Sequence, residues 1–180
     1  MKDKFPKELK LLKTVTSMAP FPSDEAIEHD EYDLWIAGSM NRNQESMNEI
    51  FAALSPQHIA RVAGAGNKVV YLLDQKADLY LNLIPGLKMW DMCAGEALIQ
   101  SMMGIVCDSD HQPLHYDPDA ADYTLTNGIM VCKNKTVFDL TNERLINNTG
   151  NDLPYYQRKS DMEVAEYRRK KALAQKAKEA

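Results

Sequence analysis

The feature of this sequence that most constrains its fold is the alternation of short apolar runs with segments of helical spacing. Residues 45–54 predict a helix, because their apolar side chains recur at i, i+3, i+4 and i+7. The apolar runs at 34–38 and 59–63 are too short for helices and are each followed by glycine or end in it. This alternation is typical of a layered sheet with helices on both faces. We therefore expect an α/β fold, a layered sandwich in which helices cover a mixed sheet.

The same pattern continues along the chain. It predicts a helix at 67–74, a half-buried strand at 77–84, a helix from Asp91 to about Gly104, a strand at 128–132 and a helix at 136–146. The runs 105–108 and 114–116 flank a turn-forming segment, so they predict a hairpin or two short strands.

The two ends differ in composition from the middle. Residues 1–30 combine a short basic amphipathic stretch with a proline-containing acidic linker. They predict an N-terminal extension that is either a solvated arm or a docking element for a partner. Residues 31–146 form the expected domain. Residues 147–180 form a polar tail, whose final part is rich in Ala, Lys, Glu and Arg and predicts a solvated helix or a disordered segment.

Composition excludes several functional classes. A net charge of −5 provides no basic field for nucleic-acid phosphates, so we expect no nucleic-acid partner. No apolar run approaches the roughly 18 residues that a membrane-spanning helix needs. The first residues lack the apolar centre of a secretory signal. The three cysteines, Cys93, Cys107 and Cys132, have no zinc-binding spacing and predict buried, reduced thiols. Together these features favour a cytoplasmic protein.

The stretch at residues 85–99 allows two interpretations. In the first, Asp91 is the N-cap of a buried helix and Trp90 packs in the core. That helix would have an apolar stripe of Ala94, Ala97, Leu98 and Met102. In the second, the Asp91 carboxylate points outward from a turn of small residues and binds a hard cation such as Mg²⁺.

This stretch and two motifs upstream of it resemble one enzyme superfamily. Trp90-Asp91-x-x-Ala94-Gly95-x-x-Leu98-Ile99 is similar to the second signature of the magnesium-dependent, lithium-sensitive phosphatases of the inositol monophosphatase superfamily. Residues 61–68 and 76–80 resemble its narrower branch, the 3′(2′),5′-bisphosphate nucleotidases. The similarity extends from about Leu34 to about Lys133. It implies the C-terminal half of an inositol monophosphatase-like fold and a phosphomonoester substrate such as adenosine 3′,5′-bisphosphate.

The resemblance also implies substrate contacts. Glycines between a strand and a helix let backbone N–H groups approach an anion, and Lys68 adds a positive charge, although strand–glycine–helix joints are also common without any ligand. In the nucleotidases, the residues matching Gly64 and Lys68 contact the nucleotide. The residues matching Ser39 and Arg42 do so too. Ser39 keeps the hydroxyl group of that pattern, whereas Arg42 replaces a histidine and is either a phosphate or base contact or an exposed turn residue.

The implied metal site is incomplete. The resemblance makes Asp91 a Mg²⁺ ligand, but the other ligands of these enzymes come from an earlier lobe that includes an Asp-Pro-(Ile/Leu)-Asp-(Gly/Ser)-Thr motif. Residues 117–120, Asp-Pro-Asp-Ala, do not match it. The four histidines are scattered and predict no nucleophile–base pair, and the methionines Met89, Met92, Met102 and Met103 predict core packing. We therefore expect no complete catalytic set within this chain, which would share Mg²⁺ with a missing N-terminal lobe and be inactive alone.

Three hypotheses follow. The chain could be half of a split or truncated enzyme, whose other lobe is a partner. It could be an inactive relic that still binds nucleotide or phosphate. It could also be a structural subunit that uses the arms at 1–30 and 147–180 to hold partners.

Overall fold

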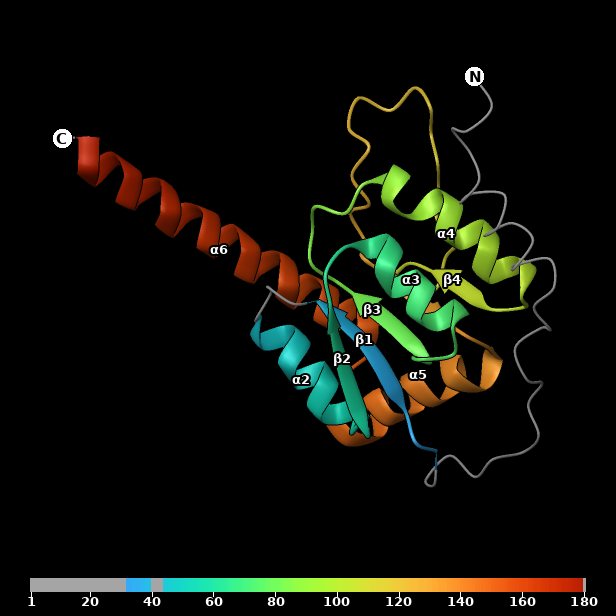
Figure 1. The fold of residues 1–180 in the computed structure, drawn as a ribbon. Helices are drawn as coiled ribbons and strands as arrows, with labels where there is room; N and C mark the ends of the chain where they lie inside the picture. Colours follow the sequence, from blue (N-terminus) through green and yellow to red (C-terminus); the bar gives the residue numbers. More distant parts are fainter. Residues whose placement is uncertain (1–31, 40–43, 180) are drawn as a thin grey trace, which may run out of the picture.

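The structure is a computed structural model that describes residues 32–39 and 44–179 (Figure 1). The predicted segment at 1–30 and Arg42 therefore lie outside the described residues. The elements are, in chain order, β1 (Trp35–Ser39), α2 (Glu45–Leu54), β2 (His58–Val62), α3 (Ala65–Leu73), β3 (Leu79–Asn82), α4 (Met89–Ser101), β4 (Ile105–Cys107), β5 (Ile129–Cys132), α5 (Lys135–Thr149) and α6 (Leu153–Glu179).

The strands form a mixed sheet in the order β2-β1-β3-β5-β4. β2, β1 and β3 are parallel, whereas β5 runs antiparallel to both β3 and β4. The strand predicted at 77–84 is shorter than expected, and all four residues of β3 are buried rather than every second one. The reason is its central position, because helices cover both faces of the sheet there.

Two hydrophobic clusters lie on opposite faces of the sheet. One cluster joins α2, α5 and the start of α6 to the face that carries Leu79 and Leu81. The other joins α3 and α4 to the face that carries Tyr80. Figure 1 shows the resulting three layers, with the sheet between the two groups of helices. This arrangement confirms the predicted fold class, a layered α/β sandwich with a mixed sheet.

The segment after β4 does not form the expected hairpin. β4 pairs with β5, and residues 114–116 form no strand. The Asp108 carboxylate accepts hydrogen bonds from the backbone N–H groups of Asp110 and Gln112, at 2.9 and 2.8 Å, and so turns the chain immediately after the strand. Further along, the Tyr116 hydroxyl donates a hydrogen bond to Glu96 and attaches this loop to α4.

Helix α4 buries a different face from the one predicted. Ala94 and Ala97 are exposed, and Trp90 is 62% exposed rather than packed in the core. The buried side chains on α4 are Met92, Glu96 and Ile99. The cause is the close approach of α4 to α3: a Cβ atom at Gly95 would lie 2.9 Å from Val69, so the glycine and not the alanines faces the neighbouring helix.

Two further predictions about packing are wrong in part. Cys107 and Cys132 are buried, but Cys93 is exposed on α4. Met103 is 74% exposed and has a positive φ of 66°, so it lies at the turn that ends α4 and not in the core. Met92 and Met102 are buried as expected.

The polar tail divides into two parts within one helix, α6. Leu153, Tyr156 and Ser160 in its first turns are buried against the domain, whereas residues 165–177 of the helix are exposed. Figure 1 shows the second part projecting away from the sheet. Of the two alternatives predicted for the end of the chain, a solvated helix or a disordered segment, the structure shows the helix. The packing of its first turns was not predicted. None of the helices in the described residues has the length and apolar composition needed to cross a bilayer.

Candidate functional site

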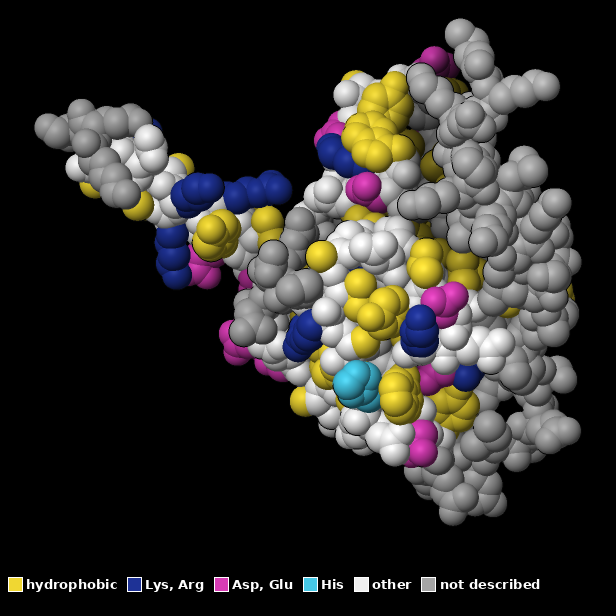
Figure 2. Space-filling view, in the orientation of Figure 1, with side chains coloured by type: hydrophobic (Ala, Val, Ile, Leu, Met, Phe, Trp, Pro, Cys, Tyr) yellow, Lys and Arg dark blue, Asp and Glu magenta, His cyan; other side chains and the backbone are white. Residues whose placement is uncertain are grey.

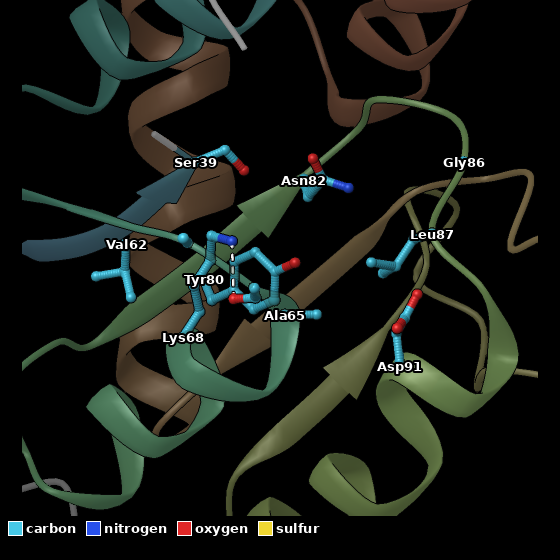
Figure 3. A pocket seen from close by; sticks show the side chains of 11 residues that line it. Ser39, Val62, Ala65, Lys68, Tyr80, Asn82, Gly86, Leu87 and Asp91 are labelled. Carbon is cyan, nitrogen blue, oxygen red and sulfur yellow. Dashed lines mark hydrogen bonds between the residues drawn. The ribbon is translucent and has the colours of Figure 1, made fainter. Parts of the chain in front are cut away.

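A cavity of about 320 Å³ lies at the carboxyl ends of the three parallel strands, where the first turns of α3 and α4 meet. This edge of a parallel sheet is where ligands bind in open α/β folds. The cavity is lined by Ser39, Val62, Ala63, Gly64, Ala65, Lys68, Tyr80, Asn82, Gly86, Leu87 and Asp91. Figure 3 shows Lys68 and Tyr80 at its centre, with Ser39 and Asn82 on one side and Leu87 and Asp91 on another.

The turn at Gly64, between the end of β2 and the start of α3, forms one wall of the cavity. Gly64 has φ 79° and ψ 142°, a conformation that L-amino acids with a side chain rarely adopt. This conformation lets helix α3 start at Ala65, immediately after the strand. The first backbone N–H groups of a helix have no acceptor within that helix, so the start of α3 presents hydrogen-bond donors and a partial positive charge at the cavity wall.

Lys68 contributes a buried positive charge to the cavity. Its side chain is 4% exposed, and its Nζ donates a hydrogen bond of 3.1 Å to the Gly64 carbonyl oxygen. The same Nζ lies 5.1 Å from the centroid of the Tyr80 ring, within the range of a cation–π contact. A carbonyl dipole and an aromatic face thus position the ammonium group. A buried lysine in such a place is well suited to bind an anion.

Asp91 is at the third position of α4 and is not its N-cap. Lys88 occupies the N-cap position, and its backbone N–H donates a hydrogen bond of 2.8 Å to Asp91 Oδ2. The carboxylate therefore stabilises the helix start from within the first turn, while the residue also lines the cavity. The interpretation of Asp91 as the N-cap is therefore wrong, although its carboxylate does stabilise the helix start. A role in binding a cation is compatible with this contact, because the hydrogen bond from Lys88 uses one of the two carboxylate oxygens.

An ion pair of Lys88 with Asp122 holds the rim near Asp91. Lys88 Nζ lies 2.8 Å from Asp122 Oδ1, and the Thr124 hydroxyl donates to the same carboxylate oxygen at 2.6 Å. The pKa of Asp122 is lowered to about 2, mainly by the hydrogen bond from Lys88 and next by the hydrogen bond from Thr124. The loop before β5 is thereby attached to the start of α4.

The described residues contribute one carboxylate to the cavity, that of Asp91. Within residues 32–39 and 44–179, no three or more His, Cys, Asp or Glu side chains are grouped as metal ligands. In the segment 117–120, the Asp117 side chain accepts a hydrogen bond of 2.9 Å from the Asp119 backbone, which is a local turn interaction. Mg²⁺ is usually held by one or two carboxylates together with substrate phosphate and water. Asp91 thus fits the role of one ligand, but it does not complete a site.

The structure brings Ser39, Gly64, Lys68 and Asp91 together, although the four residues come from different parts of the chain. Tyr80 and Asn82 also line the cavity and were not predicted as site residues from the sequence. A signal for them was present: they are the polar members of an otherwise apolar run and are two residues apart, which places both side chains on one face of β3.

Comparison with known proteins identifies the family. The profile of the "Inositol monophosphatase family" matches residues 19–150. The "3′(2′),5′-bisphosphate nucleotidase 1" of Rattus norvegicus is 34% identical over 84 residues, which are 47% of this chain and 27% of that protein. The protein of the same name from Homo sapiens is 33% identical over 84 residues, with the same coverage. The aligned part of the chain thus spans about a quarter of the length of these relatives.

Solved structures show the same fold. Inositol monophosphatase II from Staphylococcus aureus MSSA476 superposes with a TM-score of 0.53 at 17% identity, over 71% of this chain and 44% of that chain. The structure of 2′AMP-bound SaIMPase-II has a TM-score of 0.51 at 15% identity, over 85% of this chain and 51% of that chain. The family profile covers most of the 180 residues of this chain, and the chain therefore belongs to the inositol monophosphatase family.

Proposed function

We propose that this chain is the C-terminal lobe of a Mg²⁺-dependent phosphomonoesterase that resembles 3′(2′),5′-bisphosphate nucleotidase. The substrate would be adenosine 3′,5′-bisphosphate or a related phosphomonoester, and the products AMP and phosphate. The observation that carries this proposal is the presence of Ser39, Gly64, Lys68 and Asp91 around one cavity at the carboxyl edge of the sheet. The nucleotidase relatives support the nucleotide substrate. Arg42 remains a proposed substrate contact from the sequence.

The anionic group of the substrate would bind at the start of α3. Backbone N–H groups of the first turn are suited to phosphate oxygens. Lys68 would add a positive charge from within the cavity, where low exposure strengthens an electrostatic interaction. Gly64 would allow the phosphate to approach the backbone closely, since it has no side chain at the cavity wall.

Asp91 would provide one oxygen ligand for Mg²⁺. The ion, when bound, polarises the phosphoryl group and activates a water molecule. The remaining ligands would come from a lobe outside the described residues. Asp91 is in a suitable position for such sharing, because its side chain is exposed at the mouth of the cavity and is held by the Lys88 backbone.

The outer face of α4 is where we place the contact with that lobe. Trp90 is exposed, and its ring lies 5.6 Å from that of Tyr123, centroid to centroid. Cys93, Ala94 and Ala97 continue the exposed apolar surface along the helix. Figure 2 shows hydrophobic side chains gathered near the start of α4. An apolar surface beside an incomplete site supports a protein partner that completes it.

A phosphate-release assay tests whether the chain is active by itself. We expect no release of phosphate from adenosine 3′,5′-bisphosphate with Mg²⁺, because one carboxylate does not position the metal ions. Robust turnover that is lost in Asp91→Asn would show that the proposed absence of ligands is wrong. Binding of the same nucleotide, measured by calorimetry, tests the substrate: we expect saturable binding that is weakened by Lys68→Met.

A catalytically inactive relic is the second candidate. The observation that favours it is the projecting half of α6, which is exposed over several turns and is suited to hold another subunit in an assembly. In that case the chain would bind nucleotide or act structurally, and no added lobe would restore turnover. For either role we propose a cytoplasmic location, since the buried thiols of Cys107 and Cys132 fit a reducing compartment.

A further inference from the structure

The central strand β3 ends in a buried asparagine. Asn82 is 5% exposed and follows Leu81 in a strand whose other residues are leucines and one tyrosine. A buried carboxamide destabilises a fold unless its polar atoms are hydrogen-bonded. Leucine has the same branching at Cγ and would have no such penalty. The presence of asparagine at this position therefore points to a use for its polar atoms.

Asn82 lies beside Ser39 at the edge of the sheet. β1 and β3 are parallel neighbours, with Ile36 opposite Leu79 and Ala37 opposite Tyr80. Continuing the same register by two residues places Ser39 next to Asn82. Both residues line the cavity, and Figure 3 shows their side chains at the ends of the two strands. The cavity thus has a neutral polar side, formed by a hydroxyl and a carboxamide.

The Asn82 carboxamide retains hydrogen-bonding capacity. Its Nδ2 donates a hydrogen bond of 3.3 Å to the carbonyl oxygen of Ile84, two residues further along. A carboxamide has two N–H donors and one acceptor oxygen, so this long bond uses one of its groups. The remaining groups suit a ligand with a donor and an acceptor side by side.

The cavity therefore separates two kinds of recognition. Lys68 and the start of α3 provide positive charge for an anion, whereas Asn82 and Ser39 provide neutral donors and acceptors. Apolar side chains of Val62 and Leu87 also line the cavity and suit the body of a flat ring. An asparagine carboxamide can pair with the amino group and ring nitrogen of adenine through two hydrogen bonds.

We propose that Asn82 is a specificity-determining residue that hydrogen-bonds the polar edge of the base in a nucleotide whose phosphate is bound by Lys68. This inference rests on the proposed function, because it assigns a part of the same substrate to a residue of the same cavity. It predicts that Asn82 discriminates between bases and has no influence on phosphate binding.

The test is calorimetric binding by the whole chain of three ligands: adenosine 3′,5′-bisphosphate, inosine 3′,5′-bisphosphate and inorganic phosphate. Asn82→Leu should raise the Kd of adenosine 3′,5′-bisphosphate by about tenfold and leave the Kd of phosphate unchanged. It should also remove the preference for adenosine over inosine, which lacks the amino group. Lys68→Met should weaken the binding of all three ligands. Asn142→Leu on α5, outside the cavity, is the control and should change none of them.

The outcomes separate the two proposals. If the wild-type chain binds none of the ligands, the proposed function fails and this inference fails with it. The role of Asn82 is overturned, and the proposed function stands, if the wild-type chain binds the nucleotide and Asn82→Leu binds it equally well. The same conclusion follows if Asn82→Leu weakens the binding of inorganic phosphate as much as it weakens the binding of the nucleotide. Circular dichroism establishes that Asn82→Leu is folded. Asn82→Ala, which removes the carboxamide without adding a charge, gives the same test if the leucine variant does not fold.

Discussion

The Glu163 carboxylate in α6 accepts two hydrogen bonds from Ser46, the second residue of α2. One comes from the Ser46 backbone N–H, at 2.9 Å, and the other from its hydroxyl, at 3.0 Å. The N-cap residue of α2, Gln44, makes no side-chain hydrogen bond to the helix. A carboxylate from a helix more than one hundred residues away thus satisfies donors that α2 leaves without partners.

Replacing this carboxylate should destabilise the fold. We expect Glu163→Gln to lower the free energy of unfolding by about 1 kcal/mol, because a neutral amide interacts less favourably with a helix start. Urea unfolding followed by circular dichroism measures the change. Glu166→Gln, one turn further on, is the matched control: it removes only an exposed ion pair with Lys170 and should lower the midpoint less than Glu163→Gln does. Equal effects of the two substitutions would contradict a capping role for Glu163.

The motif glycine Gly95 has a packing role that can be tested by a pair of substitutions. Gly95→Ala would place its Cβ 2.9 Å from Val69 and should lower the free energy of unfolding by about 1–3 kcal/mol. The double variant with Val69→Ala should recover part of this loss, which a double-mutant cycle would reveal as coupling. Gly66→Ala in α3 is the control, since no atom lies within 4 Å of its added Cβ. It should be neutral or stabilising by up to about 1 kcal/mol.

The three cysteines should differ in reactivity. Burial, with a further contribution from Asp108, raises the pKa of the Cys107 thiol to about 12. Burial also raises the pKa of Cys132 well above its usual value. Because the thiolate is the reactive form, both should be unreactive in the folded protein. We expect one thiol per chain to react quickly with Ellman's reagent and all three to react in guanidinium chloride. Cys93→Ser should abolish the fast reaction; a fast phase that survives it would show that a buried thiol is accessible.

Stability at high pH should depend on Tyr116. The pKa of the Tyr116 hydroxyl is raised, mainly by burial and next by the hydrogen bond to Glu96. The folded state therefore holds this proton more tightly than the unfolded state does. The stabilisation is fully present below about pH 10, the ordinary pKa of tyrosine, and is lost as the pH rises toward the higher pKa of the folded state.

We accordingly expect the free energy of unfolding of the wild-type protein to fall more steeply above pH 10 than that of Tyr116→Phe. At neutral pH the variant should be less stable by about 1 kcal/mol, since Glu96 loses a hydrogen-bond donor in a buried position. Denaturant unfolding between pH 7 and 11 measures both effects. Tyr123→Phe, whose hydroxyl donates to the exposed Pro118 carbonyl, is the control. Parallel pH profiles for the wild type and Tyr116→Phe would rule out the proposed linkage.

Local patterns predicted much of the fold. The spacing of apolar residues predicted α2 at its observed bounds, and the helix predicted at 136–146 agrees with α5 within a few residues. Other elements were misjudged for a physical reason. Periodicity shows that α4 is a helix, but it does not show whether Gly95 or Ala94 faces the neighbouring helix. That choice depends on the close approach of α3, which no local pattern contains.

The sequence by itself determined the alternation of helices and strands, the turn at Gly64 and the presence of Asp91 near the start of a helix. These features follow from backbone conformation and side-chain periodicity, which act over a few residues. The tertiary structure decided which side chains share the cavity. The strand order β2-β1-β3 brings the carboxyl ends of three strands together, and so unites Ser39, Lys68, Asn82 and Asp91. It also brought Glu163 to Ser46. Contacts between residues so far apart depend on how layers pack, and packing is a property of the whole chain.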